Sequence, residues 1–370
     1  MKLLLLAGEE SGVLYAERIA EAVRGKCAAV EIRGYGDYGF ETSELAVIGF
    51  FAVLRKLRFF LRVKNTMERA IDEWKPDVVC TVDYPGMNLK LAAYAKARGI
   101  RAVHVVCPQV WAWKRGRIPK IEAALDRLCC FFPFEPELFK QGFAEFVGHP
   151  LVDEMVCEPG REGRKTEDGR RVLALLPGSR MGEIEKILPT ALEVVERLQG
   201  EISGLTVVIP AANDRAYAAI TSCVSRLKSS PGVVEVTRGG ARDALRAADA
   251  AVVASGTATL EAALIGCPTV LVYKVNWLFA AIMRRLIKGV RHIGLANIIA
   301  EKAGAGCPMP ELLQEDFTVE KVLAAVRPLL EDASANAAAR QSLAETMALL
   351  KSDGGAIERI ATTLQISRGF

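Results

Sequence analysis

A strand that passes directly into a helix is predicted by residues 250–261, which read Ala-Ala-Val-Val-Ala-Ser-Gly-Thr-Ala-Thr-Leu-Glu. The apolar start suits a buried strand, and Ser255, Gly256 and Thr257 suit the turn that opens a helix. Residues 172–182 repeat this order, because an apolar run ends in Pro-Gly-Ser-Arg ahead of an acid-rich helical turn. Units of this kind build parallel sheets.

The same alternation of short apolar runs and helix-length segments extends along the whole chain. Strands are expected at residues 3–6, 29–33, 78–82, 102–106, 128–132, near 146, and at 172–176, 206–209, 233–236, 250–254 and 269–272. Helices are expected at residues 14–23, 51–74, 89–98, 136–141, 184–198, 215–227, 241–247 and 259–265.

A linker is predicted at residues 158–171, which are rich in glycine and charge and lack apolar periodicity. It divides the chain into residues 1–160 and residues 161–341. The fold class is therefore α/β, with two Rossmann-like parallel-sheet domains. Ligands of such sheets bind beyond the carboxyl ends of the strands, so a site in a cleft between the domains is expected.

The composition excludes several functions. A net charge of +4 is too small for a protein that mainly neutralises nucleic acid. Uncharged runs reach 12 residues, short of the roughly 18 that a membrane-spanning helix needs. The apolar run after Met1 is too short for a signal peptide, and nine cysteines without a CxxC pattern indicate core-filling thiols in a cytoplasmic chain.

Two strand-to-helix turns in the second half suit phosphate. The N–H groups around Gly178, the Ser179 hydroxyl and the Arg180 guanidinium could bind a diphosphate, although a surface turn with a solvated arginine is the alternative. In the other turn, Ser255 to Thr257 lie at the positive end of a helix. Glu261 follows about one turn later, where it could bind ribose hydroxyls or simply complement the helix dipole.

A third glycine-rich stretch, residues 34–39, spells G-x-G-x-x-G. No helical pattern begins at its third glycine, and cations such as Arg55 and Lys56 stand where a ribose-binding acid belongs. We therefore reject a dinucleotide cofactor and expect a flexible loop that faces the cleft.

In the first half, Asp83 follows the strand 78–82 and precedes a Tyr-Pro-Gly turn. A carboxylate at that end of a strand could orient or deprotonate an attacking hydroxyl, but aspartate is also a common turn former. Trp111 and Trp113, beside three cations, could line a pocket for a sugar or an anionic head group, or pack in the core. His149 could reach the cleft or cap the domain, whereas His104 is expected in the core.

Two stretches have the character of surface-binding helices. Residues 50–64 place apolar side chains at helical spacing among cations, with no acid between Glu44 and Glu68. Residues 277–288 form a second basic and aromatic stretch. Both patterns favour an anionic membrane surface, and an amphipathic helix packed on its own sheet is the alternative.

Seven motifs in sequence order carry a resemblance to a known family. They are Ala7-Gly-Glu-Glu-Ser11-Gly12, Val82-Asp83-Tyr-Pro-Gly-Met-Asn88, Pro108-Gln-Val-Trp-Ala-Trp113, Val147-Gly-His-Pro150, Leu176-Pro-Gly-Ser-Arg180, Ala254-Ser-Gly-Thr-Ala-Thr-Leu-Glu261 and Leu295-Ala-Asn297. Together they resemble the lipid-A-disaccharide synthases, through nearly the whole chain. Val13 and Ala296 stand where family members usually carry Asp and Pro.

The resemblance implies an inverting glycosyltransferase of the GT-B type that needs no metal and no cofactor. Its donor would be UDP-2,3-diacylglucosamine and its acceptor 2,3-diacylglucosamine 1-phosphate. Its products would be the β-1,6-linked tetraacyl disaccharide 1-phosphate and UDP. The enzyme would be cytoplasmic and peripherally bound to the inner membrane through residues 50–64. Homodimers occur in the family, and no nucleic acid is involved.

The resemblance also assigns roles to residues. Asp83 would be the base or orienting acid for the acceptor 6-hydroxyl, and a cationic side chain would steady the departing UDP. The remaining assignments are Arg180, Gly178 and Ser179 for diphosphate, Ser255, Gly256 and Thr257 for phosphate, Glu261 for ribose, Glu9 and Ser11 for the acceptor side, Asn297 for the donor cleft, and Trp111, Trp113 and His149 for substrate. The C-terminal segment 342–370 would pack back on the first domain.

Two kinds of rival remain open. A lipid-linked N-acetylglucosamine transferase or a UDP-N-acetylglucosamine epimerase would share the loops of the second domain. A non-catalytic nucleotide-sensing or membrane-binding module would use Asp83 only as a turn former. Replacing Asp83 with Asn separates an enzyme from a module, because only an enzyme has turnover to lose.

Overall fold

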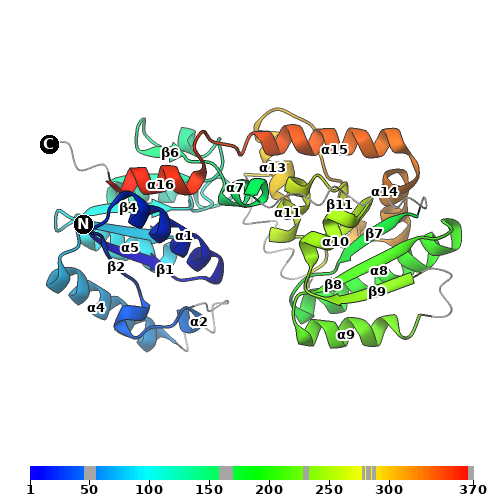
Figure 1. The fold of residues 1–370 in the computed structure, drawn as a ribbon, viewed down its shortest axis with the longest axis horizontal. Helices are drawn as coiled ribbons and strands as arrows, with labels where there is room; N and C mark the ends of the chain where they lie inside the picture. The colour runs from blue at the N-terminus through cyan, green and yellow to red at the C-terminus, as the bar shows by residue number, and fades with distance from the viewer. Residues whose placement is uncertain are drawn as a thin grey trace. The chain divides into compact units, whose positions relative to one another are not determined.

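The computed structural model describes residues 1–45, 56–157, 170–227, 233–276, 280, 285 and 289–365. The chain divides into two compact units. Unit 1 comprises Met1–Asp153 and Leu350–Phe370, and unit 2 comprises Glu154–Leu349. Each unit contains one six-stranded parallel sheet with helices on its faces (Figure 1). Most of the linker predicted at 158–171 lies outside the described residues.

The sheet of unit 1 has the strand order β2-β1-β3-β4-β5-β6. Its strands are β1 (Lys2–Ala7), β2 (Glu31–Arg33), β3 (Val78–Val82), β4 (Arg101–Val105), β5 (Arg127–Cys130) and β6 (Ala144–Phe146). Its helices are α1 (Glu10–Lys26), α2 (Thr42–Leu45), α4 (Leu57–Trp74), α5 (Pro85–Lys96), α6 (Ile118–Ala124) and α16 (Ala356–Gln365), with 3-10 turns η1 (Gly36–Tyr38), η2 (Arg115–Arg117) and η3 (Pro136–Leu138).

Alternation along β1 shows how the sheet is covered on both faces. Leu3 and Leu5 pack with side chains of α1 and α16, whereas Leu4 and Leu6 pack with side chains of α4 and α5. Successive side chains of a strand point to opposite faces, so a continuous apolar run is what a strand buried on both faces requires.

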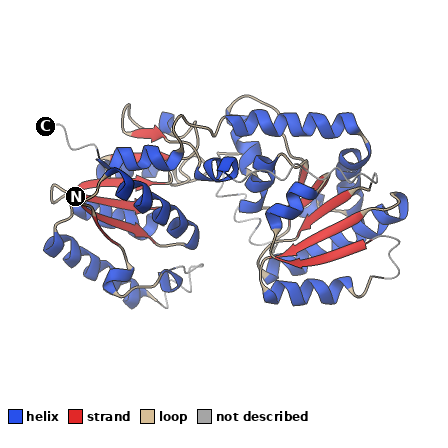
Figure 2. Cartoon of the chain, viewed as in Figure 1, coloured by secondary structure: helices blue, strands red, loops and turns tan. Residues whose placement is uncertain are grey.

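The sheet of unit 2 has the strand order β12-β11-β10-β7-β8-β9. Its strands are β7 (Val172–Leu176), β8 (Thr206–Ala211), β9 (Val233–Arg238), β10 (Ala250–Ala254), β11 (Thr269–Tyr273) and β12 (Glu311–Leu313). Its helices are α8 (Met181–Glu201), α9 (Asp214–Val224), α10 (Ala241–Ala247), α11 (Thr257–Ile265), α13 (Leu295–Lys302), α14 (Val319–Glu331) and α15 (Ala333–Ala348), and α7 (Pro150–Cys157) crosses the unit boundary (Figure 2).

The chain returns to unit 1 after α15. The segment expected to do so, 342–370, therefore starts earlier than the structure places it, because residues up to Leu349 belong to unit 2. Helix α16 packs on α1, and Arg101 Nη2 donates to the Thr363 carbonyl at 2.7 Å. Gly148 has a φ of +89°, and a Cβ there would lie 2.4 Å from Ser352 Oγ. Only glycine allows the returning chain to pass this closely.

One expected helix is wrong. Residues 136–141 form a single 3-10 turn, Pro136–Leu138, after which Phe139 is extended and buried against Phe143. Among the described residues, no helix combines the length and apolar character needed to span a membrane.

Candidate active site

Asp83 lies at the carboxyl end of β3 in a strained turn. Asp83 and Tyr84 have φ values of +49° and +52°, a left-handed conformation that costs roughly 1 to 2 kcal/mol per residue without glycine. The Asp83 N–H donates to the Val105 carbonyl of β4 at 2.9 Å. Its Oδ1 accepts the Tyr84 N–H at 2.8 Å. The turn thus holds a half-buried carboxylate at the edge where β3 and β4 end.

Glu9 follows β1, and its carboxylate interacts with the like charge of Asp83. Burial raises the pKa of Asp83, and the Tyr84 N–H only partly opposes this increase. Burial, together with the charge of Asp83, raises the pKa of Glu9. Gly8 permits this approach, since a Cβ there would lie 2.5 Å from the Tyr84 ring. A half-buried carboxyl whose pKa is raised suits proton transfer. The side chain of Ser11 lies outside the described residues.

In unit 2, the two predicted phosphate loops line one cavity of about 270 Å³. Its lining includes Gly178, Ser179, Glu183, Ser255, Gly256 and Thr257. The N-caps of α8 and α11 make no side-chain hydrogen bond, and the third N–H group of each helix, that of Glu183 or Thr259, donates to the backbone carbonyl of the N-cap residue. The N–H groups ahead of these are therefore the ones open to a ligand. Two helix N-termini that line one cavity are suited to binding an anion.

Arg180 and Glu183 form an ion pair beside this cavity. Arg180 Nη1 lies 3.3 Å from Glu183 Oε1, and the arginine side chain is 69% exposed. The pair neutralises a carboxylate that would otherwise repel a phosphate, and the exposed guanidinium has room to rotate toward one.

Glu261 is held by Arg242. Arg242 Nε donates to Glu261 Oε1 at 2.9 Å, and Arg242 Nη1 donates to Glu154 Oε1 at 2.7 Å. Glu261 does not line the cavity of the phosphate loops. The carboxylate expected to bind ribose is therefore oriented by Arg242, which also binds Glu154 of α7.

The two tryptophans differ in environment. Trp111 is buried, and its Nε1 donates to Glu135 at 3.0 Å. Trp113 is 38% exposed, with Lys114 Nζ 4.2 Å from its ring centroid. Trp111 is thus a core residue, the alternative that the sequence left open, and only Trp113 presents an aromatic surface.

Glu135 also forms part of the group of potential metal ligands found among the described residues, with Cys107 and Cys130. All three are buried, and burial raises the pKa of Glu135 to about 8. This shift favours the protonated form of the carboxyl, whose oxygens accept the N–H groups of Trp111 and Phe132. The group ties the tryptophan segment to the end of β5.

The buried histidines are neutral. His149 Nδ1 accepts the Leu151 N–H at 3.2 Å, its ring packs on Phe131 and Phe132, and burial lowers its pKa to about 4. It caps the start of α7 and has little open surface. His104 is fully buried, as expected, and its Nδ1 lies 2.7 Å from Thr81 Oγ1.

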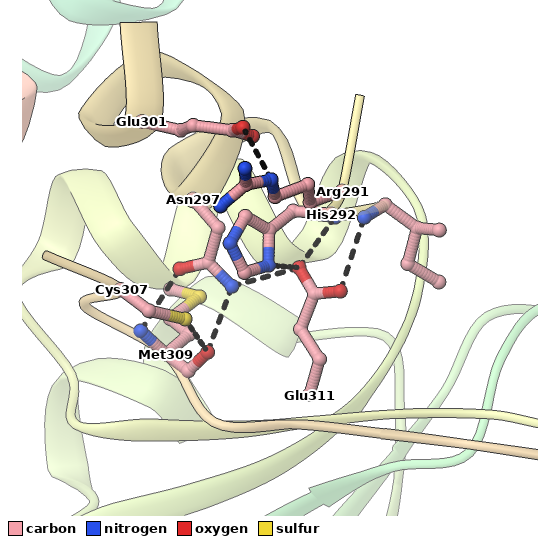
Figure 3. A network of polar contacts seen from close by, with 9 residues as sticks. Arg291, His292, Asn297, Glu301, Cys307, Met309 and Glu311 are labelled. Atoms are coloured by element: carbon pink, nitrogen blue, oxygen red, sulfur yellow. Dashed lines mark hydrogen bonds and ion pairs between the residues drawn. The ribbon is translucent and has the colours of Figure 1, made fainter. Parts of the chain in front are cut away.

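Asn297 is fully buried in a polar network of unit 2 (Figure 3). Its Oδ1 accepts the Met309 N–H, and its Nδ2 donates to the Met309 carbonyl and to Glu311 Oε1. The Glu311 carboxylate also accepts the N–H groups of Ile293 and Gly294. Asn297 was expected to line the donor cleft, but the structure shows its amide occupied in fixing the start of α13 to β12.

The family model described as lipid-A-disaccharide synthetase matches residues 3–359. The chain belongs to the lipid-A-disaccharide synthetase family. The lipid-A-disaccharide synthase of Syntrophus aciditrophicus is 36% identical over 97% of the chain and 95% of its own length. That of Neisseria meningitidis is 38% identical over 94% and 93% of the respective lengths.

Solved structures place this synthetase-family chain among the GT-B folds. MurG of Acinetobacter baumannii superposes with a TM-score of 0.60 at 13% identity, covering 98% of this chain and 99% of its own. The UDP-GlcNAc 2-epimerase of Neisseria meningitidis bound to UDP-GlcNAc gives 0.57 at 12% identity, covering 98% of each chain. Membership of the synthetase family makes the chain a glycosyltransferase of lipid A biosynthesis.

Sequence reasoning missed several supporting residues of this synthetase-family site. Asn88, Arg242 and Glu311 contact Asp83, Glu261 and Asn297, respectively, and Tyr35 contacts Asn88. Asn88 carries a signal that could have been used, because an amide within an apolar helix face is costly unless it is hydrogen-bonded. The other three become visible only when distant segments meet.

Proposed function

We propose that the chain transfers 2,3-diacylglucosamine from its UDP derivative to the 6-hydroxyl of 2,3-diacylglucosamine 1-phosphate, with inversion. The observation that carries this proposal is the Asp83 turn, which holds a half-buried carboxylate beside Glu9 at the carboxyl edge of unit 1. Family membership supports the substrates, since relatives at 36 to 38% identity are named lipid-A-disaccharide synthases.

In this reaction Asp83 takes the proton of the acceptor 6-hydroxyl as its oxygen attacks the anomeric carbon. The bond from that carbon to the UDP oxygen breaks, and UDP leaves. Oδ1 of Asp83 accepts the Tyr84 N–H, and Oδ2 accepts no hydrogen bond from the part of the chain that the structure describes. Oδ2 is therefore the oxygen that acts as the general base. A general base is most efficient when its pKa lies near the working pH.

The donor is held by unit 2. The first turns of α8 and α11 supply N–H groups and hydroxyls for the two phosphates. Arg180 neutralises the departing UDP with the guanidinium N–H groups that its pairing with Glu183 leaves over. Glu261, fixed by Arg242, offers its carboxylate to the ribose hydroxyls. No step requires a metal, because helix ends and a guanidinium supply the positive charge.

We further propose that the enzyme works at the cytoplasmic face of the inner membrane. The support comes from α4, where Leu57 and Leu61 are each 50% exposed and lie beside the exposed Arg58 and Arg62. The first part of the predicted surface helix, residues 50–55, lies outside the described residues, as does most of 277–288. An apolar strip flanked by cations matches an anionic lipid surface.

The test is UDP release by the purified protein in metal-free detergent buffer, with mass detection of the lipid product. UDP and a tetraacyl disaccharide phosphate are expected only when both substrates are present. Asp83→Asn should lower kcat by about 100- to 10,000-fold and leave UDP affinity unchanged by calorimetry. A folded protein that binds UDP but forms no disaccharide would refute the acceptor assignment and favour a lipid-linked acceptor or an epimerase.

A further inference from the structure

Asn88 links the carboxyl ends of β1 and β3, the two strands that precede Glu9 and Asp83. It is fully buried in α5, and its Nδ2 lies 3.2 Å from the Leu6 carbonyl of β1 and 3.2 Å from the Val82 carbonyl of β3. The same nitrogen lies 2.8 Å from the Asp83 carbonyl. One amide therefore satisfies the ends of both strands and the first residue of the strained turn.

Tyr35 anchors the oxygen of that amide. Its hydroxyl donates to Asn88 Oδ1 at 2.8 Å, and the tyrosine is 4% exposed. If the amide flipped, its oxygen would face three carbonyl oxygens and its nitrogen would face the hydroxyl. The three carbonyl acceptors therefore select the orientation in which the amide nitrogen points at the strand ends, and the tyrosine O–H donates to the amide oxygen on the other side.

Tyr35 lies in the glycine-rich stretch 34–39, to which the sequence analysis assigned no function. The Gly34 N–H donates to Asp37 Oδ2 at 2.7 Å, and the Tyr38 and Phe40 N–H groups donate to the Tyr35 carbonyl at 3.1 and 3.2 Å. This hydrogen-bonded turn holds Tyr35 in the core between β1 and α5, whereas the sequence suggested a flexible loop.

We propose that Tyr35 and Asn88 are a positioning pair, which holds Asp83 in its left-handed turn and sets its placement relative to Glu9. This inference rests on the proposed role of Asp83 as the base. Without the pair, the turn is free to relax toward right-handed geometry, which moves the carboxylate from its place at the strand edge. A displacement of about 1 Å is enough to lower turnover by about 100-fold.

The experiment compares Asn88→Ala, Tyr35→Phe and the matched control Tyr94→Phe. Tyr94 lies in the same helix as Asn88 and donates its hydroxyl to Asp72 at 2.7 Å, so the control also loses one tyrosine hydrogen bond. We expect kcat to fall about 10-fold in Tyr35→Phe and about 100-fold in Asn88→Ala. UDP affinity and the donor KM should stay within about twofold, and Tyr94→Phe should keep wild-type kcat.

A double-mutant cycle separates positioning from a general loss of structure. In an Asp83→Asn background, Asn88→Ala should change the residual rate by less than about twofold, because the residue through which it acts is already gone. An equal loss in both backgrounds, or kcat within twofold of wild type for both pair variants, would overturn the inference. Tyr35→Phe keeps the test open if Asn88→Ala does not fold.

The proposed function and the inference fail in different ways. If Asp83→Asn kept wild-type kcat, both the base assignment and the positioning pair would be wrong. If Asp83→Asn were inactive while Tyr35→Phe and Asn88→Ala stayed fully active, only the pair would be wrong.

Discussion

Two features of Asp83 are unfavourable to the free energy of folding: its left-handed backbone and its half-buried carboxylate. Its N–H and carbonyl are both satisfied, by Val105 and Asn88, so the turn is held by contacts on either side of the strained residue. Strain that the surroundings hold in place is common where a side chain must be aimed. The carboxylate is the part of the turn that remains available to a substrate.

The raised pKa of Asp83 predicts how activity and stability depend on pH. Because the base must be ionised, kcat/KM should fall on the acid side around an apparent pKa above about 4, the ordinary value for aspartate. A folded-state pKa above the unfolded value means that ionisation destabilises the fold once pH exceeds the unfolded pKa. Asp83→Asn should therefore raise Tm at pH 7, and the gain should shrink as pH falls toward 4.

Calorimetry of both proteins across this range, beside a pH–rate profile of the wild type, checks the prediction. An Asp83→Asn protein that is less stable than wild type at pH 7 would show that the ionised carboxylate stabilises the turn, and the assigned direction of the pKa shift would be wrong.

At the scale of elements, the sequence predicted best what depends on local burial. The strands 78–82, 172–176 and 250–254 match the structure at both ends, because each is an apolar run buried on both faces. Strand β12 was missed, since its three half-buried residues carry no alternation to detect. Among the site residues, the glycines and serines of the two phosphate loops could be predicted, because each loop lies between an apolar strand and a helix. The buried roles of Trp111 and Asn297 depend on Glu135 and Glu311, which are distant in sequence.

Helix α4 provides the prediction about membrane binding. Phe60, Val63 and Met67 pack in the core, so the exposed Leu57 and Leu61 lie outside that packed face. Changing Arg58 and Arg62 together to Glu should lower sedimentation with anionic liposomes at least tenfold, since each cation near such a surface contributes about 1 kcal/mol.

The control is the same change at Arg215 and Arg226, exposed cations in and just after α9 of unit 2. Binding by the α4 variant that equals wild type, or an equal loss in the control, would remove α4 from the membrane interaction. Neutral liposomes in parallel separate the electrostatic contribution from the apolar one.

At the scale of the whole molecule, the chain folds around separate cores. In unit 2, buried side chains of elements from β7 to α14, among them Leu173 and Leu330, form one hydrophobic cluster. In unit 1, Ile360 and Leu364 of the returning segment pack with α1 and β1 in another cluster. The donor loops and the Asp83 turn thus depend on different cores. A destabilising change in one core should affect the chemistry of its own unit first.

Two matched substitutions test this separation. Ile360 in α16 and Ile220 in α9 are both fully buried, and truncation of either to Ala should cost about 2 to 5 kcal/mol. Ile360→Ala should lower the unfolding temperature of unit 1 alone, whereas Ile220→Ala should lower that of unit 2. UDP at about 100 times its Kd should stabilise only unit 2, by about 2.7 kcal/mol. A single calorimetric transition that both substitutions shift equally would instead mean that the two cores unfold as one cooperative structure.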